Sequence, residues 1–303
     1  MDKIIEQFKR DGFTKVNTFG LTNNDALILS KLSNKLFDFY RSKKLIKSDF
    51  INYSPPSEGS EVISRFPEHD KKAFKIIEKI LRNKNLKNIL KRLLGTNYKL
   101  RDCSLRRSLP GDKGLYLHQD GIGETNLTII LSDNPNGNGS TCFLPGSHLI
   151  KTRMKEWDIE TPPFLVRTIN FVLKKTPGKI GDGYLFFNRT WHGRSINKSK
   201  EEYDVILMSF FPDKVKIPKY NWSANFIKSI KNTEFASRIE ISKKIENLKE
   251  SEKYFAVHIE KGKSELPLKH FFKVYFTIFY LRSIFAVFRP FYKFFKYKII
   301  RNY

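Results

Sequence analysis

LTIILSDNPNGNGSTCFLPGSHL, at residues 127–149, is the stretch that most strongly limits the fold. It joins a β-branched apolar run to a turn rich in Asn and Gly, and then to a Pro-Gly-Ser-His segment. Short apolar runs bounded by such turns are typical of β-strands. Residues 96–215 continue in this pattern, for example in KTPGKIGDGYLFF at 175–187 and YDVILMSFF at 203–211. We therefore expect a run of short strands across this part of the chain.

Two histidines and an aspartate flank this stretch. YLHQDG at 116–121 contains His118 and Asp120, and FFNRTWHGRSIN at 186–197 contains His192. Alternate residues of a strand point to the same face, so His118 and Asp120 can reach one metal while Gln119 points away. Two imidazoles and one carboxylate bind Fe(II) on one face and leave the other positions open for oxygen and a co-substrate. The pattern favours a non-haem iron oxygenase; for His118 taken alone, a surface loop histidine is the alternative.

The order of these motifs resembles the phytanoyl-CoA dioxygenase family of Fe(II)/2-oxoglutarate oxygenases. In that family a HQD triplet, an acidic turn, a PGSH motif and a GD...F...HG segment follow one another. The matching segments at the end are GDGYLF at 181–186, WHG at 191–193 and NKS at 197–199. FKRDGF at 8–13 is similar to the family's opening helix and the turn into its first strand. The resemblance runs from about residue 5 to residue 213.

The resemblance implies that His118, Asp120 and His192 are the iron ligands, with Fe(II) as cofactor and 2-oxoglutarate and O2 as co-substrates. The chemistry of the residues themselves agrees with this assignment. The carboxylate of Asp120 argues against the halogenating branch of related enzymes, in which that carboxylate is missing. We therefore expect hydroxylation, or another oxidation that begins with hydrogen abstraction.

One position departs from the family pattern. The family usually places an arginine after the distal histidine to bind the far carboxylate of 2-oxoglutarate, and here that position is Tyr203. An arginine binds a carboxylate through two parallel hydrogen bonds, whereas a tyrosine offers a single neutral donor. The nearest replacements are Arg194 and Lys200. We favour Arg194 because it lies beside the ligand His192; a solvated loop arginine is the alternative.

Other residues near the motifs are expected to have smaller roles. Ser199 fits the Asn-x-Ser spacing of the family and is expected to add a hydroxyl contact to the co-substrate, while Asn197 shapes the turn. Tyr116 lies on the same strand face as His118 and is a further candidate for co-substrate binding, with a packed barrel residue as the alternative. His148, in the PGSH turn, is expected to be structural.

The neighbouring residues Arg106 and Arg107 precede a Pro-Gly-Asp-Lys-Gly turn, and strand alternation sends one of them inward and the other outward. One of the two is a candidate for contact with an anionic substrate, and an exposed strand is the alternative. The two cysteines, Cys103 and Cys142, are too few for a disulfide framework or a cysteine zinc site. We expect both to be small buried hydrophobes.

The chain reads as a domain at 1–215 followed by an extension at 216–303. The first part of the domain, 1–95, is expected to be helix-rich, with amphipathic helices at 21–40 and 71–94 separated by a loop at 52–61. The second part, 96–215, is expected to form the barrel. We predict an α+β protein whose double-stranded β-helix, a jelly-roll barrel similar to that of the cupins, carries packed N-terminal helices and a helical C-terminal extension.

The extension is basic and aromatic. The last 38 residues contain eight Lys and Arg, no Asp or Glu, and fourteen Phe and Tyr, within a chain of net charge +25. Aromatic rings settle at headgroup depth while Lys and Arg reach anionic phosphates, so residues 266–303 favour contact with a membrane surface. As a helix they would place Arg282, Arg289, Lys293 and Lys296 on one stripe, which Pro290 interrupts. A helical cap on the barrel and a nucleic-acid contact are the alternatives.

The sequence thus favours a cytoplasmic Fe(II)/2-oxoglutarate-dependent dioxygenase at the inner face of a membrane. The opening MDKIIEQFKR is charged and lacks the apolar run that export requires. An anionic or lipid-linked small molecule is the expected substrate, for example a glycan precursor, a glycolipid or an acyl thioester. The alternatives are a catalytically inactive jelly-roll binding protein, suggested by Tyr203, and a nucleic-acid modifying oxygenase, suggested by the positive charge.

Overall fold

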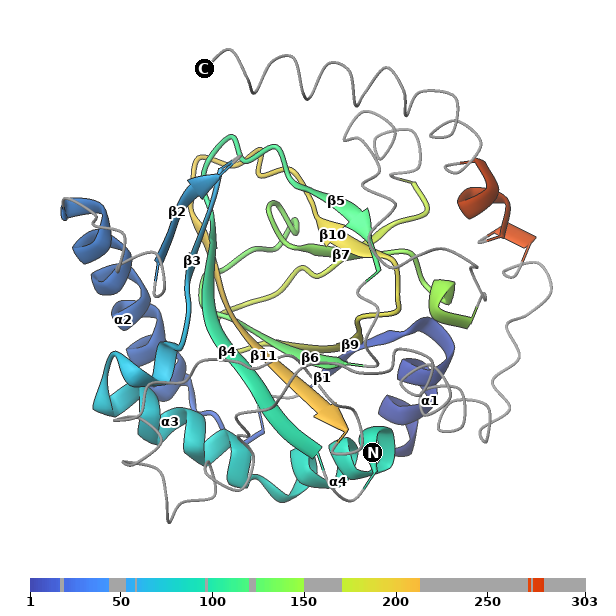
Figure 1. The fold of residues 1–303 in the computed structure, drawn as a ribbon, viewed down its shortest axis with the longest axis horizontal. Coiled ribbons are helices and arrows are strands. Elements are labelled where there is room, and N and C mark those ends of the chain that lie inside the picture. Colours follow the sequence, from blue (N-terminus) through green and yellow to red (C-terminus); the bar gives the residue numbers. More distant parts are fainter. Residues whose placement is uncertain are drawn as a thin grey trace, which may run out of the picture.

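Two antiparallel sheets form the centre of the protein. The computed structural model describes residues 1–16, 19–43, 53–57, 59–95, 98–119, 124–149, 171–212, 272–273 and 275–280. The larger sheet runs, in spatial order, through β1 (Phe13–Val16), β9 (Gly183–Phe187), β6 (Thr125–Ile130), β11 (Tyr203–Pro212), β4 (Tyr98–Ser108), β3 (Ser60–Ile63) and β2 (Tyr53–Ser57). The smaller sheet contains β5 (Leu115–His118), β10 (His192–Arg194), β7 (Thr141–Phe143) and β8 (Lys174–Lys175). The two sheets face each other, and helices cover the outer side of the larger one (Figure 1).

Strand alternation gives the larger sheet two different faces. On β11, Ile206, Met208 and Phe210 belong to the large apolar cluster under the helices. Tyr203 belongs to a second, smaller cluster with Val205 and Leu207 packed against it. That cluster also contains Phe143 of the opposite sheet, so it lies between the two sheets. We call this side of the larger sheet the inner face.

The helices begin at capping residues that the sequence supplies. Thr22 and Asp25 form a reciprocal capping box at the start of α2 (Asn23–Ser42). The predicted single helix at 71–94 is wrong, because it divides into α3 (Lys71–Arg82) and α4 (Lys84–Leu94). Asn83 has extended backbone angles, and its side chain accepts hydrogen bonds from the amides of Asn85 and Leu86 in the first turn of α4. A residue that caps the next helix in this way cannot continue the previous one.

The loop predicted at 52–61 is also wrong, because most of it forms the hairpin of β2 and β3. Two prolines in β2 argued against a strand, yet β2 is the last strand of the sheet. An edge strand has unpaired amides on one side, so it tolerates proline. With β1, these strands show that residues 1–95 contribute to the larger sheet as well as to its helices. The division of the chain at residue 215 stays a prediction.

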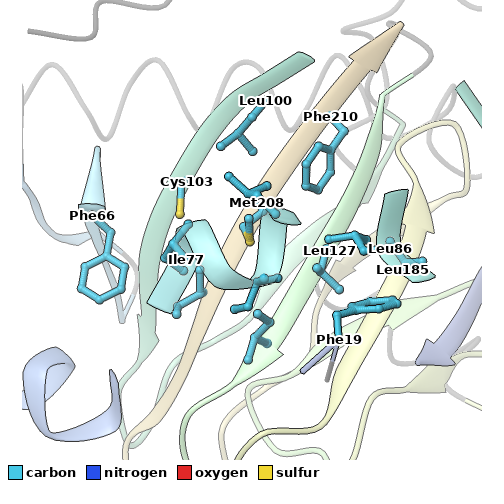
Figure 2. Packing of buried hydrophobic residues seen from close by; sticks show 14 of the residues in the cluster. Phe19, Phe66, Ile77, Leu86, Leu100, Cys103, Leu127, Leu185, Met208 and Phe210 are labelled. Carbon is cyan, nitrogen blue, oxygen red and sulfur yellow. The ribbon is translucent and has the colours of Figure 1, made fainter. Parts of the chain in front are cut away.

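The main core lies between the larger sheet and the helices. Figure 2 shows Ile77 and Leu86, from α3 and α4, on the same side of the sheet as Leu127 and Met208. Cys103 is part of this core, and Cys142 is also buried, so the prediction of free, buried cysteines is confirmed. Burial raises the pKa of the Cys142 thiol to about 12, which keeps it neutral. With the jelly-roll arrangement of the sheets, this layer of helices confirms the predicted α+β barrel.

Arg107 and Asp204 form a buried ion pair on the side of the larger sheet that the helices cover. Arg106 is exposed and Arg107 is buried, as alternation predicts, but Arg107 lies under α2 and away from the inner face. Its Nε and Nη2 donate to the two carboxylate oxygens of Asp204 at 2.7 and 2.6 Å. Ser33 of α2 donates to the same carboxylate at 2.7 Å, and the guanidinium lies over the ring of Phe37. The prediction of a substrate contact is therefore wrong for Arg107, whose charge is neutralised within the fold.

A second buried contact joins α1 (Asp2–Asp11) to the PGSH turn. The Nε2–H of His148 donates to the carbonyl oxygen of Lys9 at 2.9 Å, which leaves Nδ1 as the unprotonated nitrogen. Nδ1 is buried without a partner among the described residues. Gly12, which ends α1 at φ 81°, packs so closely that a Cβ there would lie 2.6 Å from this nitrogen. The structural role predicted for His148 is thus borne out by its contacts.

The described residues of the C-terminal extension, 272–273 and 275–280, are helical. They expose Phe272, Tyr275, Phe276, Phe279 and Tyr280 and bury Ile278. No helix among the described residues combines the length and the apolar character needed to cross a membrane. The predicted basic stripe at 282–296 lies outside the described residues.

We expect Asp204→Asn to lower the free energy of unfolding by about 3–5 kcal/mol, because it leaves the buried Arg107 cation without its bidentate partner. Urea unfolding followed by circular dichroism measures this change. The matched control is Asp2→Asn, which removes an ion pair with Arg92 at the exposed surface and should leave the unfolding midpoint unchanged. Equal midpoints for the two variants would contradict the role given to the buried pair.

The loss of folding stability at low pH should depend on His148, because burial lowers the pKa of its imidazole from 6.5 to about 4. Between these values the unfolded state binds a proton that the folded state does not, so stability falls as the pH is lowered from about 6.5 to about 4. We expect this residue to account for a loss of about 2 kcal/mol between pH 7 and pH 5.

The test compares unfolding of the wild type with that of His148→Gln at both pH values. The variant keeps a side-chain N–H donor but cannot be protonated in this range. Its loss of stability on acidification should be smaller than that of the wild type by the stated amount. An identical loss in both proteins would show that the imidazole is not held in its neutral form.

Candidate metal centre

The two histidines of the motifs lie directly opposite each other. His118 is the last residue of β5 and His192 is the first residue of β10, and the two are paired in the antiparallel register of these strands. Their ring centroids are 4.4 Å apart. The structure therefore brings together, on neighbouring strands, two imidazoles that are far apart in the sequence.

The orientation of His192 is fixed by its surroundings. Its side chain is buried, and its Nδ1 lies 2.7 Å from the carbonyl oxygen of Thr190. Because a carbonyl oxygen only accepts, Nδ1 carries the proton and Nε2 has the lone pair that a metal binds. The ring of Phe186, on the inner face of the larger sheet, lies 5.3 Å from the imidazole. The imidazole of His192 thus lies where the smaller sheet meets Phe186 of the larger sheet.

Asp120, the third predicted ligand, lies outside the described residues. Within the described ranges, no group of three His, Cys, Asp or Glu residues is close enough to hold a metal, as expected when one ligand of the set is not among them. Gln119, between His118 and Asp120, donates its Nε2–H to the carbonyl oxygen of Arg189 at 2.5 Å. This contact ties the segment after His118 to the turn before His192. Two imidazoles, one of them followed two residues later by a carboxylate, fit Fe(II) by donor type.

Arg194 has a specific partner in the structure. Its Nε and Nη2 donate to the carboxylate of Asp112 at 2.6 and 3.1 Å. Asp112 is fully buried and also accepts from the hydroxyl of Ser108 at 2.6 Å and from the amide of Gly114 at 2.8 Å. The arginine therefore fastens the turn between β4 and β5 onto β10. Its predicted contact with 2-oxoglutarate stays a prediction, and the bidentate ion pair is what the described residues show.

Tyr203 is buried on the inner face, opposite Ser108 of β4. Burial raises the pKa of its hydroxyl above the usual range, so it is neutral and cannot replace the charge of an arginine. Arg106 is two residues before Ser108 on β4 and is paired with Val205, which is two residues after Tyr203 on β11. Arg106 therefore lies on the same face of the sheet as Tyr203. It is exposed and makes no ion pair or hydrogen bond to another described residue. Sequence alternation separated Arg106 from Arg107, but only the strand register places it beside Tyr203.

The remaining predicted contacts lie in a turn near this region. The hydroxyl of Ser199 donates to Asn197 at 2.6 Å, and Asn197 in turn donates to the carbonyl oxygens of Ser108 and Glu201. Asn197 thus shapes the turn, as predicted, while the contact of Ser199 with a co-substrate stays a prediction. Tyr116 is in β5, but its side chain lies outside the described residues, and Lys200 is exposed.

Comparison with solved structures shows what this fold is similar to. AviO1 from Streptomyces viridochromogenes Tue57 is 19% identical, with a TM-score of 0.54, over 73% of this chain and 97% of the other. EctD from S. alaskensis, solved with 2-oxoglutarate and 5-hydroxyectoine, is 17% identical, with a TM-score of 0.56, over 73% and 79%. HygX from Streptomyces hygroscopicus, solved with nickel, 2-oxoglutarate and hygromycin B, is 13% identical, with a TM-score of 0.52, over 71% and 88%. At these identities the likeness is one of fold.

The comparison by sequence is more specific. No curated protein matches the chain. The family model of phytanoyl-CoA dioxygenase (PhyH) matches residues 69–202, a range that includes His118, Asp120 and His192. Over residues 69–202 the chain thus matches the phytanoyl-CoA dioxygenase family, whose members are Fe(II)/2-oxoglutarate-dependent oxygenases.

Proposed function

We propose that this protein is an Fe(II)/2-oxoglutarate-dependent dioxygenase that hydroxylates a C–H bond of a glycan precursor or glycolipid at a membrane surface. The observation that carries the proposal is the pairing of His118 with His192, whose tautomer is set by the carbonyl oxygen of Thr190. Of the substrate classes expected from the sequence, an acyl thioester fits less well. The inner face of the larger sheet carries the polar side chains of Asn126 and Ser209 beside its apolar cluster, and an acyl chain would leave these hydrogen-bonding groups unused.

In this proposal His118, Asp120 and His192 hold the iron. When bound, the iron supplies, with 2-oxoglutarate and O2, the oxidant that removes hydrogen from a substrate C–H and returns a hydroxyl. The protein positions these groups. The contact of Gln119 with Arg189 holds the segment that carries the ligands, and the apolar ring of Phe186 borders the imidazole of His192.

We propose Arg106 as the residue that binds the far carboxylate of 2-oxoglutarate. Arg194, the candidate from the sequence, already binds the buried carboxylate of Asp112, and removing it from there would leave that charge without its partner. Arg106 has an exposed guanidinium on the inner face and no ion pair among the described residues. A bidentate contact from an arginine at this place supplies the charge that Tyr203 lacks.

Anaerobic titration of the protein with Fe(II) and 2-oxoglutarate should give a visible charge-transfer band, because the co-substrate chelates the metal. We expect His192→Ala to abolish the band by removing a ligand. The matched control is His148→Gln, which changes a histidine outside the pair and should keep the band. A wild type that folds but gives no band would favour the alternative of an inactive binding protein, with the neutral Tyr203 as the physical reason.

The same titration distinguishes the two arginines. Arg106→Gln should raise the 2-oxoglutarate concentration at half-maximal absorbance about 10- to 100-fold, the effect of losing one charge-assisted contact. Arg194→Gln is combined with Asp112→Asn so that no buried charge is left unpaired, and this double variant should bind 2-oxoglutarate as the wild type does. The opposite result would assign the carboxylate to Arg194.

We further propose that the C-terminal extension contacts an anionic membrane surface. The helical residues 275–280 expose Phe276 and Phe279 at 61% and 58%. Exposed rings on a basic segment suit the interface of a bilayer, where rings enter the headgroup layer and cations meet phosphate. Nucleic acid is less suited to this surface, because its aromatic residues are interleaved with Ile, Val and Leu.

Cosedimentation with phosphatidylglycerol-containing vesicles should detect this contact, and neutral phosphatidylcholine vesicles should bind less. Phe276→Ser combined with Phe279→Ser is expected to weaken binding at least tenfold, because it removes two exposed rings that would enter the headgroup layer. Phe39→Ser serves as the control, because Phe39 is an exposed ring on α2 at 47%. Equal binding by all three proteins, or preferential binding to an oligonucleotide, would contradict the membrane proposal.

A further inference from the structure

Exposed aromatic side chains gather on one surface of the protein. Among the described residues, ten large hydrophobic side chains are exposed, and six of the ten come from only two short segments. These six are Phe171, Phe272, Tyr275, Phe276, Phe279 and Tyr280. Single exposed rings need no explanation, whereas a cluster of them marks a surface that meets a partner. We call these six residues the aromatic rim.

The two segments of the aromatic rim lie close together. Phe171 is 80% exposed, and the Nζ of Lys273 lies 6.0 Å from the centre of its ring. The rings of Phe272 and Phe276 stack with their centres 6.2 Å apart, and the ring of Tyr275 lies edge-on to that of Phe276 at 6.1 Å. Residues far apart in the sequence therefore form one surface.

The helical residues of the rim have a buried side and an exposed side. Thr277 and Ile278 are buried, at 9% and 3%, whereas Phe276 and Phe279 beside them are 61% and 58% exposed. Figure 1 shows these helical residues, in red, at the periphery of the molecule. The buried side holds the segment in place, and the aromatic side faces outward.

The strand register ties the aromatic rim to the candidate metal centre. Lys174 of β8 is paired with Phe143 of β7, which is paired on its other side with His192 of β10. Neighbouring strands are about 4.8 Å apart, so two steps place Lys174 about 10 Å from His192. Phe171 precedes Lys174 by three residues, and three residues span at most about 10 Å. The rim therefore begins within about 20 Å of the metal centre.

The charge of this region favours a bilayer over a second copy of the chain as the partner. Lys273 lies beside the rim, and the last 38 residues contain eight Lys and Arg and no Asp or Glu. Two copies of so basic a segment repel each other, whereas anionic phospholipid attracts it. Exposed aromatic rings beside basic side chains also suit the headgroup layer, where the rings are buried and the cations meet phosphate.

We propose that the aromatic rim seats the protein on an anionic bilayer, with Phe171 and the β8 edge of the smaller sheet facing the lipid. The inference rests on the proposed dioxygenase function, and it extends the membrane contact from the C-terminal extension to the sheet that carries His118 and His192. In this orientation the metal centre lies within about 20 Å of the headgroups. A lipid-linked glycan then reaches the iron while its lipid stays in the bilayer, whereas a free sugar gains nothing from this seating.

The test attaches a nitrobenzoxadiazole fluorophore, whose emission shifts to the blue when it leaves water, to single added cysteines. Cys103 and Cys142 are buried, so the folded protein should be labelled only at the added residue. Phe171→Cys, Phe276→Cys and Phe39→Cys are each titrated with phosphatidylglycerol-containing vesicles. We expect the labels at 171 and 276 to shift to the blue and to be quenched by spin-labelled lipid.

Phe39→Cys is the matched control, because Phe39 is an exposed ring on α2, at 47%, and α2 lies on the opposite side of the view in Figure 1. Its label should stay in water. A label at 171 that stays in water while the label at 276 responds would overturn the inference, since the extension would then bind alone. An equal response at all three positions would also overturn it, because the bound protein would have no fixed orientation.

Other partners of the rim would give different results. A blue shift at 171 that appears without vesicles as the protein concentration rises would assign the rim to a second copy of the chain. A shift with an oligonucleotide and none with vesicles would assign it to nucleic acid. Either result would overturn the inference.

The charge-transfer titration with Fe(II) and 2-oxoglutarate separates this inference from the function on which it rests. A band in a protein whose label at 171 stays in water would overturn the seating and leave the dioxygenase in place. A label at 171 that enters the lipid, in a protein without a band, would support the seating and contradict the catalytic proposal.

Discussion

The antiparallel pairing of β5 with β10 is the constraint on which the candidate site depends, because it alone sets His118 opposite His192. A shift of one residue in this register would turn one imidazole to the other side of the sheet. Contacts at both ends oppose such a shift. At one end Gln119 bonds to Arg189, and at the other Arg194 binds the carboxylate of Asp112. The ion pair of Arg194 thus joins β10 to the turn before β5.

The larger sheet separates two chemically different layers. Its outer face packs on the helices and buries the Arg107–Asp204 ion pair among apolar side chains. Its inner face carries Asn126, Ser209 and the exposed Arg106. Strand alternation lets the same strands serve both layers. Arg106 and Arg107, for example, are adjacent in sequence and face opposite sides of the sheet. The core that stabilises the sheet thus leaves its other face available for ligands.

The sequence predicted those features that depend on local pattern. The start of α2 and the opposite faces of Arg106 and Arg107 follow from capping and from alternation. Features that depend on distant partners were missed. Asp112 as the partner of Arg194, and the alignment of Asp102 with Asn126, require the register of strands that no local pattern encodes. The break at Asn83 was missed because a helical apolar period continues through it, and β2 because prolines are tolerated only at an edge.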